Sequence, residues 1–209
     1  MKHWEQLTAT VGIWCSERYP VHEDALRLAE FAGIRPKDRV LDIGTGNGIL
    51  AIYAEAMHGG TYTGIDVDET ALTFAVDSAI RNGQDIRFLP LAAEDAPKML
   101  GHGVFDRILM NPPYYTDGTP GERALARHGS AEQLENWLHA AFLLLNNGGT
   151  AALCYPAEQL ARAFRALDKS RFAPKRMALI EANGFARLAL IEAKKLGGDG
   201  MKIEIRNGR

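Results

Sequence analysis

Helical and strand-like hydrophobic periodicity alternate along most of this chain. Residues 21–31 carry Ala25, Leu28 and Ala29 on one helical stripe and are followed by Gly33, which favours a helix that ends there. Residues 61–67 are rich in β-branched side chains and predict a strand. The same reasoning predicts strands over residues 39–44, 61–67, 86–89, 104–110 and 150–155, and helices over residues 21–31, 49–58, 68–81, 131–145 and 157–167. This repetition predicts a mostly parallel sheet covered by helices on both faces.

The last part of the chain departs from this alternation. Two apolar segments, residues 177–181 and 186–191, flank Asn183-Gly184, a dipeptide that favours a tight hairpin turn. The predicted fold class is therefore α/β, with a seven-stranded, mostly parallel sheet, helices on both faces and a C-terminal antiparallel hairpin.

Length and composition favour one folded unit. The chain has 209 residues, of which 46% are hydrophobic and 24% charged, as is ordinary for a globular protein with a full-sized core. We expect a single domain over residues 1–209, with an N-terminal helical or lid segment over residues 1–35 and the core over residues 36–209. Trp4 and Trp14 lie in the N-terminal segment, as either a lid over a ligand or a hydrophobic clasp on the core.

No segment resembles a membrane span or a secretory leader. Charged residues interrupt the N-terminal stretch, and no apolar run approaches the roughly 20 residues that a bilayer requires, so the expected location is the cytoplasm, away from membranes. Cys15 and Cys154 are far apart and match no paired metal or redox spacing. The six histidines also lack zinc-type pairing, and no metal site is predicted.

Charge is distributed unevenly along the chain. Residues 1–149 hold 12 Lys and Arg against 20 Asp and Glu, a net charge of −8, whereas residues 150–209 hold 12 against 6, a net charge of +6. The basic C-terminal part is compatible with an anionic partner such as RNA. On charge alone it is equally compatible with a solvated protein surface.

The first predicted strand ends in a glycine-rich DxGxGxG motif at residues 42–48. Gly44, Gly46 and Gly48 allow the backbone to turn sharply and to come close to a ligand. A dinucleotide site would show GxGxxG, with its third glycine one residue later. The Asp42 carboxylate at the strand end would repel a pyrophosphate and attract an ammonium group, which favours S-adenosylmethionine over NAD.

Acidic residues also follow the next two strands. Asp66, followed by Val67, ends the second strand and is placed to accept hydrogen bonds from two ribose hydroxyls. Glu94-Asp95 follows the third strand, and we expect one of these two carboxylates, Asp95 in preference to Glu94, to contact an adenine amine.

Residues 111–114 read Asn-Pro-Pro-Tyr and come directly after the strand at residues 104–110. A side-chain amide, two prolines and an aromatic ring at a strand end form a rigid notch with a stacking surface, which suits a planar ring with an exocyclic amine. Taken alone, the tetrapeptide is equally typical of a simple turn. Residues 115–130 are polar and charged and are expected to be a long, substrate-facing loop.

Together, these motifs resemble the class I S-adenosylmethionine-dependent methyltransferases over residues 39–155, and the NPPY motif resembles that of the amino-methyltransferases. The resemblance implies a Rossmann-like sheet and S-adenosylmethionine as cofactor, with S-adenosylhomocysteine as product. It implies that the Asn111 side-chain oxygen and the Pro112 carbonyl accept hydrogen bonds from the target amine while Tyr114 stacks on its ring. The expected cofactor-binding residues are Asp42, Gly44, Thr45, Gly46, Gly48, Asp66, Val67, Glu94, Asp95 and Asn111.

The segment after the tetrapeptide is similar to a bacterial family that methylates N6 of the adenine next to the anticodon of valine tRNA. The residues that carry this likeness are Tyr115, Arg123, Arg127, Trp137 and Leu138. The resemblance implies a tRNA partner, with Tyr115, Arg123 and Arg127 as RNA-binding residues. Alternatively, Arg123 and Arg127 form a solvated helix face, and Trp137 is expected to be mainly a packing residue.

Three other functions stay open at this point. The first is N5-methylation of a protein glutamine in a release factor or ribosomal protein, which uses the same chemistry. The second is an NAD-dependent oxidoreductase on a similar sheet, which the DxGxGxG spacing disfavours. The third is a non-catalytic RNA-binding relative, which the intact Asn111 disfavours.

Overall fold

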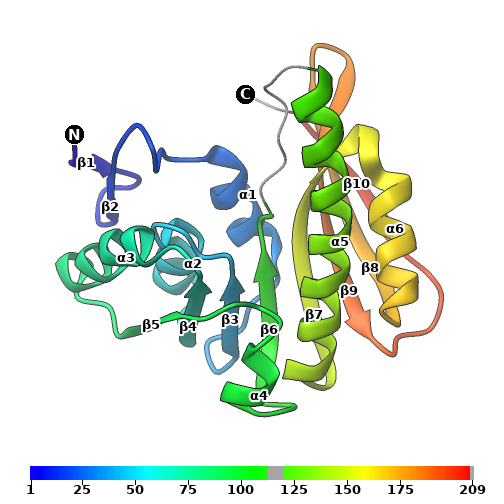
Figure 1. Ribbon diagram of the computed structural model, residues 1–209, viewed down its shortest axis with the longest axis horizontal. Helices are drawn as coiled ribbons and strands as arrows, with labels where there is room; N and C mark the ends of the chain where they lie inside the picture. Colours follow the sequence, from blue (N-terminus) through cyan, green and yellow to red (C-terminus); the bar gives the residue numbers. More distant parts are fainter. Residues whose placement is uncertain (113–119, 208–209) are drawn as a thin grey trace.

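The computed structural model describes residues 1–112 and 120–207, with side chains described outside residues 113–131. Its main elements form a sheet between two layers of helices (Figure 1). The strands are β1 His3–Gln6, β2 Gly12–Cys15, β3 Arg39–Ile43, β4 Thr61–Asp66, β5 Ile86–Pro90, β6 Phe105–Met110, β7 Leu145–Pro156, β8 Phe172–Ala182, β9 Phe185–Lys195 and β10 Lys202–Asn207. The helices are α1 Glu23–Phe31, α2 Ile49–His58, α3 Glu69–Asn82, α4 Ala96–Leu100, α5 Pro120–Leu144, the 3-10 turn η1 Ala157–Gln159 and α6 Leu160–Lys169.

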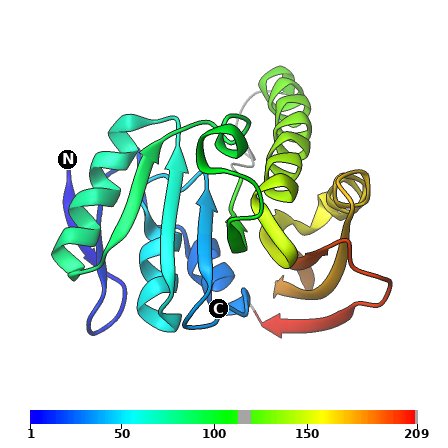
Figure 2. The same cartoon turned by 90° about the horizontal axis from the view of Figure 1, so that it is seen from below.

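The main sheet has the strand order β10-β8-β9-β7-β6-β3-β4-β5. Figure 2 shows its twist from the green β5 edge to the red β10 edge. From β3 the chain proceeds outward through β4 to β5, then returns to β6 on the other side of β3 and proceeds to β7. The order therefore reverses between β3 and β6, and ligands of open α/β sheets bind at such a switch point, beyond the carboxyl ends of the strands.

Alternating side chains of the central strands build two separate cores. Leu41 and Ile43 of β3 pack with α5 and α6 in one cluster, whereas Val40 packs with α1 and α2 in the other. β6 alternates in the same way, with Ile108 on the first face and Leu109 on the second. This two-residue alternation places helices on both faces of the sheet, as predicted.

The α/β fold with a largely parallel sheet is confirmed, and the hairpin around Asn183-Gly184 joins the antiparallel pair β8 and β9. The strand count was wrong, because the main sheet has eight strands rather than seven. The additional strand, β10, pairs in parallel with β8 at the sheet edge. β10 lacks the continuous run of apolar residues that marks a buried strand. Its two apolar side chains, Ile203 and Ile205, are exposed.

The expected loop over residues 115–130 was also wrong for residues 120–130, because α5 begins at Pro120. Proline is common at the first helical position, where its missing N–H is not needed for the helix. Gly129 and Ser130 favoured a loop in the sequence, yet the helix continues through them. None of the helices in the described part of the chain is long and apolar enough to cross a membrane.

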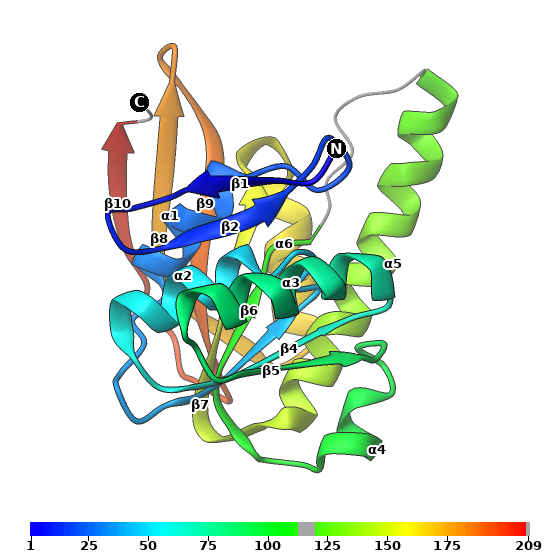
Figure 3. The same ribbon diagram turned by 90° about the vertical axis from the view of Figure 1, so that its left-hand side faces the viewer.

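The N-terminal segment begins with a hairpin that the sequence did not predict, and the helix predicted over residues 21–31 follows it as α1. β1 and β2 pair in antiparallel register and form a separate two-stranded sheet that lies across α3 (Figure 3). Trp4 and Trp14 meet edge to face with ring centroids 5.4 Å apart. Asn82 of α3 accepts a hydrogen bond from the Gly12 N–H at 3.1 Å and donates to the Gly12 carbonyl at 2.8 Å. The hairpin is thus a clasp on α3.

We expect Asn82→Ala to lower the free energy of unfolding by about 1–3 kcal/mol, because the variant leaves both polar groups of Gly12 without their partner. Urea denaturation measures this change. Asn147→Ala, at an exposed asparagine of β7, is the control and should change stability by less than about 0.5 kcal/mol. Equal stability of Asn82→Ala and the wild type would show that the hairpin does not depend on this contact.

Candidate functional site

A cavity of about 920 Å³ opens at the carboxyl ends of the central strands. Its walls come from the ends of β3, β4 and β6, the segment after β5, the second half of α5, the beginning of α1 and the β9 hairpin. The lining residues are His22, Asp24, Ile43, Gly44, Ile65, Asp66, Val67, Leu91, Ala92, Ala93, Glu94, Asn111, Pro112, Glu132, Gln133, Asn136, Trp137, Pro156, Arg187 and Leu188. The cavity lies at the switch point between β3 and β6.

The glycine-rich loop after β3 is tied to the end of β4. The backbone N–H groups of Gly44 and Thr45 both donate to the Ile65 carbonyl, at 2.9 and 3.0 Å. The N–H of Gly46 donates to the Asp66 carboxylate at 2.8 Å. These three bonds fix the loop against the neighbouring strand, so the shape of this cavity wall is set before any ligand arrives.

Asp42 lies behind this loop and does not line the cavity. Its carboxylate is buried, accepts a hydrogen bond from the Thr45 hydroxyl at 2.7 Å and is also bonded by the Ala51 N–H. Burial raises the pKa of Asp42 to about 7, although the bond from Thr45 lowers it. Asp42 was expected to attract a ligand ammonium, and the structure places its carboxylate against Thr45 and Ala51, where it holds the loop from within.

The three glycines of the motif serve different purposes. A Cβ on Gly44 would lie 2.3 Å from the Trp137 ring, and one on Gly48 would lie 2.8 Å from the Ala75 Cβ. Gly46 has a φ of +56° and open space beside it. Of the three, only Gly44 lines the cavity, and its missing side chain makes room for the Trp137 ring, while Gly48 allows α2 to pack closely on α3.

The wall beyond β4 and β5 combines a carboxylate with apolar surface. Asp66 accepts a second hydrogen bond, from the Asp68 N–H at 2.9 Å, and still faces the cavity. Val67 is 73% exposed and lines the cavity, so a flat ligand could cover its apolar surface. Glu94 lines the cavity, whereas Asp95, the residue preferred from the sequence, does not and instead precedes α4.

Asn111 and Pro112 line the cavity next to the glycine loop. Ile43 and Met110 are register partners in the parallel pair of β3 and β6, so the residues that follow them, Gly44 and Asn111, leave the sheet side by side. The sequence-predicted residues Tyr114 and Tyr115 lie outside the described residues. The side chains of Arg123 and Arg127 do so as well.

The mouth of the cavity contains residues that were not among the site residues predicted from the sequence. Arg187 of β9 forms an ion pair with Asp24 of α1 at 3.0 Å, and its side chain is 54% exposed. His22 lies beside them in the lining. Arg187 is distant in the sequence from His22 and Asp24, and they come together because β9 pairs with β7 inside the sheet, next to α1.

The segment that leads to the mouth is anchored beside the glycine loop. The Tyr19 hydroxyl donates to the Asp68 carboxylate at 2.8 Å, and Arg18 donates to the same carboxylate at 2.9 Å. The side chain of Asn47, within the DxGxGxG motif, donates to the Tyr19 carbonyl at 3.3 Å. Of the N-terminal residues, His22 and Asp24 reach the cavity, whereas Trp4 and Trp14 do not line it.

The family model and the related sequences that match this chain are all methyltransferases. The sequence model of the methyltransferase small domain matches residues 9–153. The tRNA1(Val) (adenine(37)-N6)-methyltransferase of Vibrio campbellii is 33% identical over 141 residues, covering 66% of this chain and 59% of that protein. The ribosomal protein L11 methyltransferase of Thermus thermophilus is 41% identical over 117 residues, covering 50% of this chain and 44% of that protein.

Solved structures agree with this family and with the fold. The crystal structure of TrmN from Thermus thermophilus superposes with a TM-score of 0.68 at 31% identity, over 82% of this chain and 48% of that chain. This chain thus spans between 44% and 59% of the length of the three relatives described.

The raised pKa of Asp42 predicts a specific dependence of stability on pH. From its ordinary value of 3.8 up to about 7, the unfolded chain releases the Asp42 proton while the folded protein keeps it, so the free energy of unfolding falls as pH rises through this window. The loss is on the order of 4 kcal/mol. Urea denaturation of the wild type and of Asp42→Asn, from pH 4 to pH 7.5, measures this difference. A stability difference that stays constant over this range would mean that the buried carboxyl ionises normally.

Proposed function

The chain belongs to the methyltransferase small domain family of S-adenosylmethionine-dependent methyltransferases, and we propose that it methylates the exocyclic N6 of an adenine in tRNA, next to the anticodon. The observation that carries this proposal is the single cavity that joins the wall formed by Asp66, Val67 and Glu94 to Asn111 and Pro112. A methyl donor on that wall and a planar amine at the NPPY motif would share one enclosed space.

The cavity wall matches the chemistry of the cofactor. Asp66 is a hydrogen-bond acceptor with unused lone pairs for ribose hydroxyls, since a carboxylate accepts about four bonds and two are made by Gly46 and Asp68. Val67 offers apolar surface to the adenine ring, and Glu94 offers an acceptor to its amine. Thr45 and Asp42 support the loop from behind. When bound, S-adenosylmethionine supplies an electrophilic methyl group on a positively charged sulfur.

The proposed catalytic residues position the substrate amine. The Asn111 side-chain oxygen and the Pro112 carbonyl accept hydrogen bonds from its two N–H groups, which turns the nitrogen lone pair toward the methyl group. Tyr114 stacks on the ring. Positioning of this kind, with preorganised dipoles, accounts for much of the acceleration in such transfers. The amine releases a proton to solvent after transfer, so a strong general base is unnecessary.

Several features favour RNA as the substrate. Arg187 places an exposed guanidinium at the mouth of the cavity, where it can contact a phosphate next to the target base. Residues 150–209 carry a net charge of +6. Stacking would come from Tyr115, and phosphate contacts from Arg123 and Arg127. An unpaired loop base needs little free energy to leave its neighbours and stack on an aromatic side chain. The choice of tRNA follows from the name of the Vibrio relative.

A protein substrate is the second candidate. It is favoured by the similarity to the ribosomal protein L11 methyltransferase over half of this chain. A glutamine side-chain amide is planar and carries the same N–H groups as an adenine amine, so Asn111 and Pro112 would serve it equally well. In that case Arg187 would contact an acidic residue instead of a phosphate.

Methyl-labelled S-adenosylmethionine distinguishes these substrates. The protein is incubated separately with total tRNA, ribosomal RNA, ribosomal proteins and a release factor, and the label in each pool is counted. We expect label in tRNA, recovered as N6-methyladenosine after digestion. Label confined to a protein pool would replace the first candidate by the second, and label in none would leave the chain without either activity.

Asn111→Ala should lower kcat at least about a hundredfold, as the loss of one preorganised polar partner of the reacting group does in other enzymes. The Kd of S-adenosylmethionine should stay within a few-fold of the wild type, because Asp66 and Glu94 are unchanged. Single-turnover kinetics and calorimetry measure the two effects, with Asn147→Ala as the exposed control. Near-normal turnover by Asn111→Ala would mean that other groups hold the amine.

A further inference from the structure

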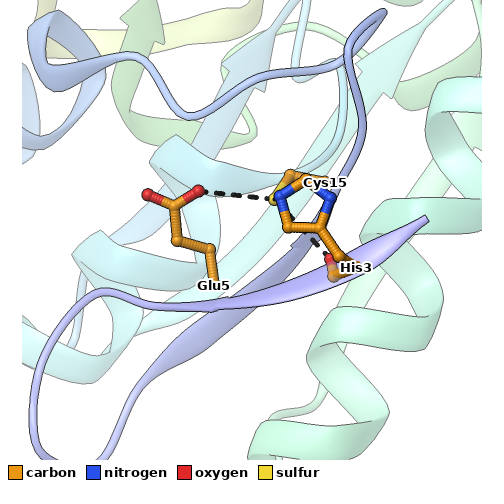
Figure 4. A group of neighbouring side chains, drawn as sticks. All are labelled: His3, Glu5 and Cys15. Atoms are coloured by element: carbon orange, nitrogen blue, oxygen red, sulfur yellow. Dashed lines mark hydrogen bonds between the residues drawn. The ribbon is translucent and has the colours of Figure 1, made fainter. Parts of the chain in front are cut away.

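Three potential metal ligands converge on the N-terminal hairpin, away from the cavity. His3 and Glu5 lie two residues apart on β1, on the same face of the strand, and Cys15 of β2 is the register partner of His3. The Cys15 Sγ lies 3.2 Å from the His3 Nε2 and 3.5 Å from the Glu5 Oε2. Figure 4 shows the three side chains directed toward one another.

Acceptors outnumber protons in this cluster. The Cys15 thiol has one proton, whereas the His3 ring, the Glu5 carboxylate and the His3 carbonyl all lie within hydrogen-bond reach of its sulfur. The His3 Nδ1 faces the Met1 carbonyl at 3.3 Å, and a carbonyl only accepts. In the neutral tautomer in which Nδ1 donates to this carbonyl, the lone pair of Nε2 points toward Cys15.

We propose that His3, Glu5 and Cys15 form a binding site for a zinc ion. Imidazole, thiolate and carboxylate are the ligand types that Zn²⁺ takes in proteins. With bond lengths of about 2.0–2.3 Å, tetrahedral ligand atoms are roughly 3.4–3.6 Å apart, close to the separations of 3.2 and 3.5 Å from the Cys15 sulfur. Three ligands leave the fourth position to water or to a group from a partner.

The surroundings fit a cation at this place. The contact between His3 Nδ1 and the Met1 carbonyl is the usual way in which a metal-binding histidine is oriented by a neighbouring acceptor. Among the described residues, Glu5 forms no ion pair, so no Lys or Arg competes for its carboxylate. Zinc would displace the thiol proton to solvent, and the two charges of the ion would be balanced by Cys15 and Glu5.

A zinc ion would cross-link the two strands, because His3 and Glu5 belong to β1 and Cys15 belongs to β2. A two-stranded hairpin is only marginally stable in water, and this one depends on α3 for its other contacts. A ligand that binds only the folded hairpin stabilises it. The site is thus separate from methyl transfer, and its presence does not depend on the proposed substrate.

Cobalt(II) is the spectroscopic probe for this site. The tag-free protein, residues 1–209, is titrated with Co²⁺ and then with Zn²⁺ in the presence of a competing chelator. We expect one ion per chain, a thiolate-to-cobalt charge-transfer band in the near ultraviolet, and loss of that band on addition of Zn²⁺. Cys15→Ser should abolish the band, and His3→Ala should weaken binding at least tenfold. His102→Ala, at an exposed histidine outside the hairpin, is the matched control.

Two outcomes would overturn the proposal. One is a folded wild type without the band or without stoichiometric binding, in which case the cluster is only hydrogen-bonded. The other is unchanged binding by His3→Ala, which changes an exposed side chain and should leave the fold intact, as circular dichroism can verify. A zinc-dependent rise in Tm that is present in the wild type and His102→Ala but absent in His3→Ala would support the site independently of cobalt.

Discussion

The site depends on how the end of β4 holds the loop that follows β3. The Ile65 carbonyl and the Asp66 carboxylate accept three successive backbone N–H groups, from Gly44, Thr45 and Gly46. Bonds of this kind are costly to leave unmade in a partly buried place, so they hold the loop against the end of β4. This arrangement leaves Gly44 facing the cavity, with the Trp137 ring packed directly against it. Asp66 therefore holds the loop after β3 in place and also faces the proposed ligand.

Much of the fold could be predicted from the sequence, because the central strands and helices carry strong local periodicity. The helix predicted over residues 68–81 is present as α3, and the Asp68 side chain caps its N-terminus by accepting from the N–H groups of Thr70 and Ala71. The elements that were missed are stabilised by distant partners rather than by their own pattern. The hairpin at Gly12 is held by Asn82, seventy residues away, and β10 is an edge strand with exposed apolar side chains.

The candidate site was predictable to the extent that strand ends converge in a parallel sheet. Asp66, Val67, Glu94, Asn111 and Pro112 lie at the end of a strand or in the segment after it, and all line one cavity. The direction in which each side chain points could not be predicted from the sequence. Asp42 stands at a strand end as well, yet its carboxylate is buried behind the loop. Arg187 and Asp24 meet because β9 lies between β7 and β8 in the sheet, next to α1.

Calorimetric titration of the wild type and of Asp66→Ala with S-adenosylmethionine, and in parallel with NADH, tests the central role of Asp66 most directly. The wild type should bind one S-adenosylmethionine per chain and no NADH. Asp66→Ala should bind the cofactor at least tenfold more weakly, because both the ribose acceptor and a bond that orders the loop are lost. Saturable NADH binding without S-adenosylmethionine binding, or unchanged affinity in Asp66→Ala, would contradict the assignment of this cavity.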